Sequence, residues 1–240
     1  MGSDGKLPVG GSAGVDIQEF LRRVAEIPSP LVARGTRGRL IFAMDATASR
    51  QPTWDRACGI QAEMFEATAG LGGLEIQLVY FRGYGECKAS SWQSSAPELL
   101  RRMSSVECLA GHTQWCRVFT HALSETRRQK VGALVCVGDS MEEDADRLGK
   151  LAGELGLLGV PAFMFQEGGD SVTERVFRQL AQLTGGVCCR FDAGSARQLK
   201  ELLSAVAVYA AGGLVALEDL SRNRGGMVRL LTDRMTRLGV

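Results

Sequence analysis

One apolar run, residues 40–44, constrains the fold of this chain more than any other segment. Its sequence is Leu-Ile-Phe-Ala-Met, and it continues directly into Asp45, with hydroxyl side chains two and four residues later at Thr47 and Ser49. A continuous apolar run of this length is typical of a strand that is buried on both faces inside a parallel sheet. Asp45 would then lie at the carboxyl end of the strand, where open α/β sheets bind their ligands.

The rest of the chain alternates strand-like apolar segments with amphipathic helical patterns. A second apolar run, residues 131–137, is also followed by an acid, Asp139. Helical patterns of roughly 10 to 18 residues separate such runs, which indicates a mostly parallel sheet with helices on both faces. A turn through Gly83 and Gly85 predicts a hairpin that adds a short edge strand. We therefore expect a doubly wound, mostly parallel α/β fold.

The sequence divides into four segments. Residues 1–14 are rich in Gly and Ser and are expected to form a flexible tail. Residues 15–37 have the apolar spacing of a helix followed by a linker, and residues 38–211 carry the alternating α/β pattern. Residues 212–240 begin with a Gly-Gly pair and then hold a short apolar segment and a basic amphipathic stretch, and we expect them to be an appended piece.

Composition and charge argue against several classes of protein. A content of 45% hydrophobic and 23% charged residues in 240 residues is that of an ordinary globular chain with one sizeable core. The net charge of +1 gives no field that would recruit nucleic acid or an anionic membrane. No apolar run approaches the roughly 20 residues that span a bilayer. The N-terminus lacks the apolar segment of a secretion signal, and seven cysteines without CxxC spacing favour a reducing, cytoplasmic compartment.

Oxygen-bearing side chains from three loops are expected to meet at the carboxyl edge of the sheet. They converge if the two apolar strands are neighbours where the strand order reverses. Carboxylate and hydroxyl oxygens suit Mg²⁺ or Mn²⁺, with Ca²⁺ as an alternative. A site with few direct carboxylates leaves a coordination position that an acidic side chain of a partner protein can fill. The candidate metal ligands are Asp45, Thr47, Ser49, Thr113 and Asp139.

This pattern resembles the von Willebrand factor type A domain, whose metal-ion-dependent adhesion site (MIDAS) reads DxSxS, then Thr, then Asp. The resemblance covers roughly residues 38–210, including the order of the elements. Three positions differ from the usual pattern: Thr47 replaces Ser, and His112 and Ser140 stand where Gly is common, but no oxygen ligand is lost. The matching residues are Asp45-x-Thr47-x-Ser49, Gly111-His112-Thr113 and Asp139.

The resemblance implies a Rossmann-like open sheet with a Mg²⁺ or Mn²⁺ site on its top edge that binds proteins and does not catalyse a reaction. It also implies a bacterial intracellular protein. The implied partner presents an Asp or Glu to the metal ion, and an ATPase or another subunit of a larger complex is such a partner.

Capping provides an alternative role for the same residues. Thr47 or Ser49 can cap a helix that begins near Pro52, and Asp139 can cap a helix expected from Glu142. In that case the acids at 142–144 are favourable charges in the first turn of the helix.

Two residues beside Thr113 are candidates for contact with a partner. His112 can be a partner contact, a neighbour of the metal ion, a proton shuttle or a plain surface residue, and the surface role is favoured because no nucleophile is paired with it. Trp115 can contact a partner, although aromatic residues at such positions more often pack in the core.

The sequence leaves two alternative functions open. A Mg²⁺-dependent phosphatase or hydrolase would use Asp45 as nucleophile or ligand, but its loop lacks a second acid two residues later, and no base is paired with a nucleophile. We therefore do not expect an enzyme. A component of an RNA–protein complex would need a basic surface with aromatic residues, which the near-neutral charge argues against.

Overall fold

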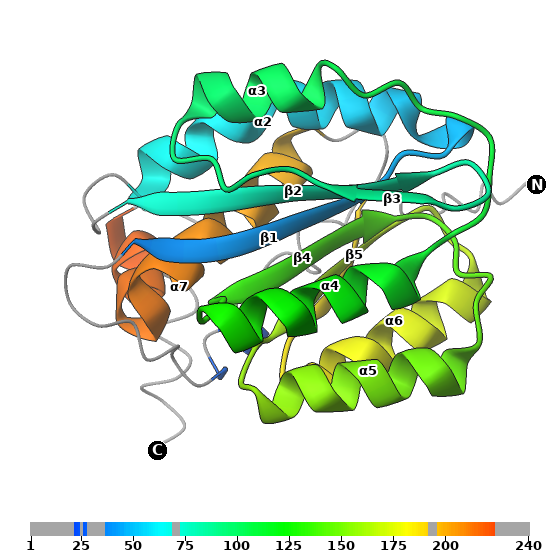
Figure 1. Ribbon diagram of the computed structural model, residues 1–240. Helices are drawn as coiled ribbons and strands as arrows, with labels where there is room; N and C mark the ends of the chain where they lie inside the picture. The colour runs from blue at the N-terminus through cyan, green and yellow to red at the C-terminus, as the bar shows by residue number, and fades with distance from the viewer. Residues whose placement is uncertain (1–21, 25, 28–36, 69–72, 192–195, 224–240) are drawn as a thin grey trace, which may run out of the picture.

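A computed structural model of the chain describes residues 22–24, 26–27, 37–68, 73–191 and 196–223. Its centre is a six-stranded sheet with the order β3-β2-β1-β4-β5-β6 (Figure 1). All neighbouring strands are parallel except β2 and β3, which form the expected hairpin. The strands are β1 Gly38–Asp45, β2 Leu74–Arg82, β3 Glu86–Ala89, β4 Ala133–Gly138, β5 Ala162–Glu167 and β6 Cys188–Phe191.

Helices cover both faces of the sheet, which confirms the predicted fold class. On one face lie α2, α3 and α7, and on the other lie α4, α5 and α6 (Figure 1). The chain leaves β1 toward β2 on one side and later returns to β4 on its other side, so the strand order reverses between β1 and β4. The helices are the 3₁₀ turn η1 Ala48–Arg50, α2 Gln51–Thr68, α3 Ala96–Met103, α4 Trp115–Arg128, α5 Ala145–Leu157, α6 Ser171–Thr184 and α7 Ala196–Asn223.

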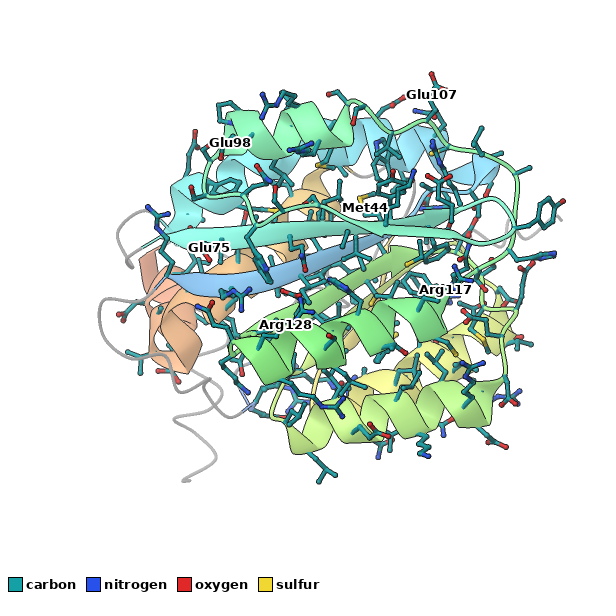
Figure 2. All side chains as sticks on the ribbon, in the orientation of Figure 1. Met44, Glu75, Glu98, Glu107, Arg117 and Arg128 are labelled. Carbon is teal, nitrogen blue, oxygen red and sulfur yellow. The ribbon has the colours of Figure 1, made fainter. Side chains whose placement is uncertain are left out.

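Strand β1 is buried along its whole length, as its apolar run predicts. Leu40, Phe42 and Met44 belong to the core under α2, α3 and α7, whereas Ile41 and Ala43 belong to the core under α4, α5 and α6. Figure 2 shows Met44 between the sheet and the layer of α2 and α3, with charged side chains at the periphery of the molecule. One strand therefore joins the two cores.

The C-terminal boundary expected at residue 212 falls inside α7. The helix is kinked at Gly213, whose φ of 69° and ψ of −162° are not helical, and it continues to Asn223. Ala216 and Leu217, beyond the kink, are buried in the same core as Leu40. Residues up to 220 therefore pack with the α/β unit instead of forming an appended piece, because the apolar side chains of Ala216, Leu217 and Leu220 contribute to its core. Residues 224–240 and the tail expected at 1–14 lie outside the described residues, as does most of the segment 15–37.

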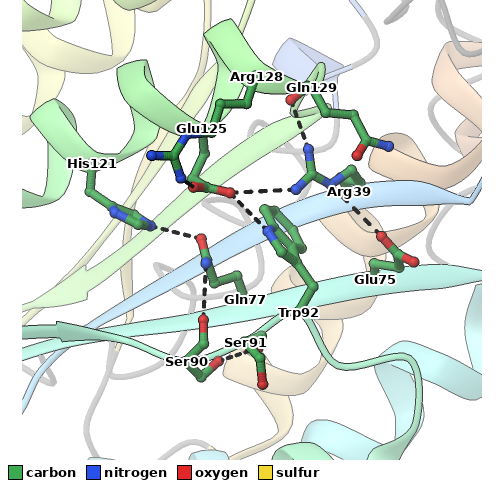
Figure 3. Close-up of polar contacts among 10 residues, drawn as sticks. All are labelled: Arg39, Glu75, Gln77, Ser90, Ser91, Trp92, His121, Glu125, Arg128 and Gln129. Atoms are coloured by element: carbon green, nitrogen blue, oxygen red, sulfur yellow. Dashed lines mark hydrogen bonds and ion pairs between the residues drawn. The ribbon is translucent and has the colours of Figure 1, made fainter.

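A buried polar cluster fixes α4 against the sheet (Figure 3). The guanidinium of Arg39 in β1 lies 3.7 Å from the ring centre of Trp92 and donates to the carbonyl oxygen of Gln129 at 2.8 Å. It also pairs with the carboxylate of Glu125 at 3.5 Å, and the indole Nε1 of Trp92 donates to the same carboxylate at 2.9 Å. Because a buried charge is costly without partners, these contacts hold α4 in one position over β1.

Two further findings bear on the class of protein. All seven cysteines are free thiols. In the part of the chain that the structure describes, no helix combines the length and the apolar character needed to cross a membrane.

Substitution of Gly38 by Ala should destabilise the fold through α7. A Cβ at this position would overlap the Cα of Ala211 and the carbonyl oxygen of Ala210, and both are backbone atoms that cannot move aside independently. We expect the free energy of unfolding, measured with urea, to fall by about 1–3 kcal/mol or more. The matched control is Gly153→Ala in α5, where a Cβ meets no atom within 4 Å. This control should gain about 0.5–1 kcal/mol, and equal effects of the two variants would contradict the close packing of α7 on β1.

Candidate functional site

The carboxyl ends of β1 and β4 lie side by side and deliver two acids to one edge of the sheet. Met44 pairs with Val137 in the parallel register, so Asp45 and Gly138 are the next residues along the two strands. A Cβ on Gly138 would lie 3.5 Å from the Cβ of Asp45 and 2.5 Å from the indole ring of Trp115. Only glycine therefore fits between these side chains, and Asp139 follows it directly. The structure thus brings Asp45 and Asp139 together as the sequence predicts.

Asp45 is a buried carboxylate that is only half satisfied. Its side chain is 1% exposed, and its Oδ1 accepts a hydrogen bond from the backbone N–H of Thr47 at 2.7 Å. Its Oδ2 is buried and has no hydrogen-bond partner among the described residues. Burial raises the pKa of Asp45 to about 6, against the hydrogen bonds from Thr47, which lower it; the charge of Asp139 raises it further.

The hydroxyl residues of the first loop do not cap the helix that follows. Thr47 stands at the N-cap position of η1 without a capping hydrogen bond from its side chain. Ser49 instead donates its hydroxyl to Oδ2 of Asp139, at 3.2 Å. The capping role is therefore wrong for Thr47. The hydrogen bond of Ser49 joins the loop after β1 to the loop after β4, which are two of the three loops at this edge.

The third loop, which precedes α4, is held at the same edge by backbone hydrogen bonds. The N–H of Leu109 donates to the carbonyl oxygen of Ala46 at 3.0 Å, and the N–H of His112 donates to the carbonyl oxygen of Gly83 at 3.2 Å. Thr113 is buried; its Oγ1 accepts from the N–H of Glu142 at 3.0 Å, and its own N–H donates to the Glu142 carboxylate at 3.2 Å. Thr113 is thus tied to the loop that follows Asp139.

The acids after Asp139 have a different role from the one expected. Helix α5 begins at Ala145 and not at Glu142, and its N-cap is Asp144, which accepts from two backbone N–H groups at 2.9 and 3.1 Å. Asp139 is therefore not the cap of this helix. Glu143 instead accepts hydrogen bonds from the N–H groups of Trp115 and Cys116, the latter at 2.9 Å. It satisfies the free N-terminal amides of α4 from another loop, where a negative charge is favourable.

One signal in the sequence could have indicated that a residue from another loop caps α4. The residue before α4 is Gln114, which is not a good N-cap residue and makes no capping bond. Its side-chain amide donates instead to carbonyl oxygens of Arg82 at 3.2 Å and Glu86 at 3.3 Å in the β2–β3 hairpin. A helix without its own cap requires acceptors from elsewhere, and the acids at 142–144 were available.

Two charged residues at this edge were missed by the sequence reasoning. Arg50 is 3% exposed, and its guanidinium forms ion pairs with Glu167 and, at 3.5 Å, with Asp139. Glu167 is the last residue of β5 and also accepts from the hydroxyl of Thr53. This third acid at the end of a strand was not recognised, because the polar Gln166 separates it from the apolar residues of β5.

The two candidate partner contacts differ in accessibility. Trp115 is fully buried, packs edge-on against Phe81 and Phe177, and donates its Nε1 to the carbonyl oxygen of Ser140 at 3.1 Å. The interpretation of Trp115 as a partner contact is therefore wrong, because core packing removes it from the surface.

His112, in contrast, has a side chain that is 66% exposed. Its ring lies 3.0 Å from the carboxylate of Glu142 and 5.2 Å from the ring of Tyr84, which is 83% exposed. A partner that reached this edge would meet both rings.

The donor set suits a hard divalent cation. Mg²⁺ and Mn²⁺ prefer oxygen ligands. The candidate residues offer the unpaired oxygen of Asp45, the carboxylate of Asp139 and the hydroxyls of Thr47, Ser49 and Thr113. Within the described ranges, no three or more His, Cys, Asp and Glu side chains are grouped so as to hold a metal ion.

Comparison with solved structures identifies the fold as that of von Willebrand factor type A domains. A von Willebrand factor type A protein from Catenulispora acidiphila matches with a TM-score of 0.61 and 12% identity, over 74% of this chain and 43% of that one. The SpRpn10 VWA domain matches with a TM-score of 0.55 and 12% identity, over 74% and 98% of the two chains. Proximal thread matrix protein 1 from the mussel byssus matches with a TM-score of 0.57 and 16% identity, over 73% and 48%.

No protein-family model and no curated protein matches the sequence. The match spans less than half of the Catenulispora and mussel chains. The likeness is therefore one of fold, and the function has to be argued from the site.

The pKa of Asp45 predicts how the stability of the metal-free protein depends on pH. Because the folded-state pKa of about 6 lies above the ordinary value of 3.8, the folded state binds the proton more tightly than the unfolded state. The resulting stability is present at low pH and is lost as the pH rises through about 6, to a total of about 3 kcal/mol.

This dependence is measured as the free energy of unfolding in urea and EDTA between about pH 3.5 and pH 7, the range that includes both pKa values. We expect Asp45→Asn to lose most of the decline that the parent shows. The matched control is Asp55→Asn, an exposed acid in α2, which should follow the parent curve. Parallel curves for the parent and Asp45→Asn would contradict the raised pKa of Asp45.

Proposed function

We propose that this chain is a protein-binding module whose binding depends on a divalent cation, Mg²⁺ or Mn²⁺, with Ca²⁺ as an alternative. The residues that would hold the ion are Asp45, Thr47, Ser49, Thr113 and Asp139. The observation that carries the proposal is the buried and unpaired Oδ2 of Asp45 beside a second carboxylate at the carboxyl edge of the sheet.

The physical support is the cost of leaving that oxygen without a partner. Burying a carboxylate is unfavourable unless a hydrogen bond or a cation compensates it. Asp45 has one hydrogen-bonded oxygen and one bare oxygen. Among the described residues, the cation that acts on it is Arg50, whose charge has a smaller effect on the pKa of Asp45 than burial, Thr47 or Asp139. A divalent cation at this position would satisfy the bare oxygen and relieve the repulsion between Asp45 and Asp139.

The partner we propose is a protein that presents an Asp or Glu side chain. When bound, the ion would keep a coordination position for that carboxylate, because the five side chains named above leave one position of a six-coordinate shell open. The exposed rings of Tyr84 and His112 and the half-exposed Leu109 lie on loops at this edge and offer apolar contact area around such a carboxylate. Seven free thiols suit a reducing compartment, so we place the interaction in the cytoplasm, with an ATPase or another subunit of a larger complex as the partner.

Binding of the ion should stabilise the fold and should require Asp45. At an Mg²⁺ concentration of 100 times the Kd, the free energy of unfolding should rise by about 2.7 kcal/mol. The increase, measured as a thermal shift, should be absent in Asp45→Ala and retained in the exposed control Asp55→Asn. An equal shift in Asp45→Ala and the parent would show that the ion binds elsewhere.

Capture of partners from an extract of the source cells tests the binding function. The immobilised protein should retain one or more proteins in Mg²⁺ and release them in EDTA, as identified by mass spectrometry. Asp45→Asn keeps the shape of the side chain and should retain none of them, whereas Asp55→Asn should retain the same set. Retention that is unchanged by EDTA would contradict a metal-dependent interaction.

A further inference from the structure

Arg50 lies between two of the acids at the site and is shielded from solvent. Its NH1 is 3.5 Å from Oδ2 of Asp139, and its NH2 forms an ion pair with Oε2 of Glu167. The same Oδ2 of Asp139 accepts the hydroxyl of Ser49, at 3.2 Å. The guanidinium therefore contacts a carboxylate that we have assigned to the cation.

The two ion pairs of Arg50 differ in kind. Glu167 is buried, with 8% exposure, and also accepts from Thr53, so Arg50 and Glu167 form an enclosed pair. The side chain of Asp139 is 29% exposed, and its contact with Arg50 is longer. Arg50 can consequently lose Asp139 and remain paired with Glu167, so that no buried charge is left without a partner.

The charges of Arg50 and of the three acids around it together match a divalent cation. With Asp45, Asp139 and Glu167 ionised and Arg50 positive, these four side chains carry two net negative charges. One divalent cation would neutralise them. In the absence of the ion, Arg50 is the positive charge that Asp139 contacts.

We propose that Arg50 is an internal counter-ion of this site, which pairs with Asp139 when no divalent cation is bound and competes with the cation for that carboxylate. The inference rests on the proposed function and adds a control of ion affinity to it. A divalent ion at the site breaks the contact between the guanidinium and Asp139. The ion pair with Glu167, which also accepts a hydrogen bond from Thr53, stays in place and keeps Arg50 next to the site. Ion affinity is then lower than the oxygen ligands by themselves would give.

Burial distinguishes this role from direct contact with the partner. An arginine that bound the acidic side chain of a partner would need an accessible guanidinium, and Arg50 is only 3% exposed. Its Nε is buried without a hydrogen-bond partner among the described residues, which indicates that the group is not held by a full set of structural hydrogen bonds.

Titration with Mn²⁺, followed by isothermal calorimetry, tests the competition. Arg50→Gln removes the charge, and we expect its Kd for Mn²⁺ to be about tenfold lower than that of the parent, which corresponds to a modest screened interaction between charges. Arg50→Lys keeps the charge and should bind Mn²⁺ much as the parent does. Glu167→Gln leaves Asp139 as the remaining carboxylate partner of Arg50 and should raise the Kd.

A second variant covers the case in which Arg50→Gln is unstable because Glu167 is left unpaired. The double variant Arg50→Gln, Glu167→Gln removes both charges of the enclosed pair. It should bind Mn²⁺ at least as tightly as the parent and about tenfold more tightly than Glu167→Gln alone. Urea unfolding of each variant shows that the fold is retained.

The outcomes separate the two proposals. If the parent binds Mn²⁺ and Arg50→Gln or the double variant binds it more weakly, Arg50 supports the ligands and the counter-ion role is overturned, while the metal site stands. If Arg50→Gln binds Mn²⁺ and the parent does not, the counter-ion role is supported in its strongest form. If neither the parent nor any variant binds a divalent ion, both proposals are overturned.

Discussion

The burial of β1 on both faces is the constraint on which the rest of the structure depends. Alternate side chains of this one strand belong to the two cores, so its position fixes both helical layers. The same burial brings the carboxylate of Asp45 out of water at the end of the strand. At a fully solvated edge, this acid would keep the usual pKa of an aspartate. Burial beside the core makes its negative charge unfavourable unless a partner compensates it.

The loops around Asp45 are held by polar contacts between segments that are distant in sequence. Glu142 and Glu143 connect the loop after β4 to the start of α4, and Ser49 connects the loop after β1 to Asp139. The cluster of Arg39, Trp92 and Glu125 fixes the middle of α4 on the sheet. Because both ends of this network are rigid elements, the candidate oxygen donors are placed by the sheet and by α4, and their positions do not depend on one flexible loop.

The sequence predicted the strands, the hairpin and the meeting of Asp45 with Asp139 because these follow from local patterns. An apolar run buried on both faces is recognisable, and parallel strands necessarily place their carboxyl ends at one edge. The start of α5 was misjudged because acids are equally favourable before a helix and in its first turn. Arg50 and Glu167 are 117 residues apart, and no local pattern indicates such a pair. The sequence could not decide whether Trp115 packs in the core or contacts a partner, because only the tertiary structure shows which side of a helix faces the core.

If the edge holds a cation as proposed, the cost of burying Asp45 and the affinity for the cation would be two aspects of one free energy. An ionised Asp45 with a bare oxygen destabilises the folded protein. In the proposed site, a cation that satisfied this oxygen would remove the destabilisation, and the loss in the metal-free protein would become binding energy. Arg50 acts in the opposite direction, because by pairing with Asp139 it relieves part of the same charge excess in advance. The balance between an acid that lacks a partner and an arginine beside it would then set how readily the site takes an ion, and the surrounding fold would remain unchanged.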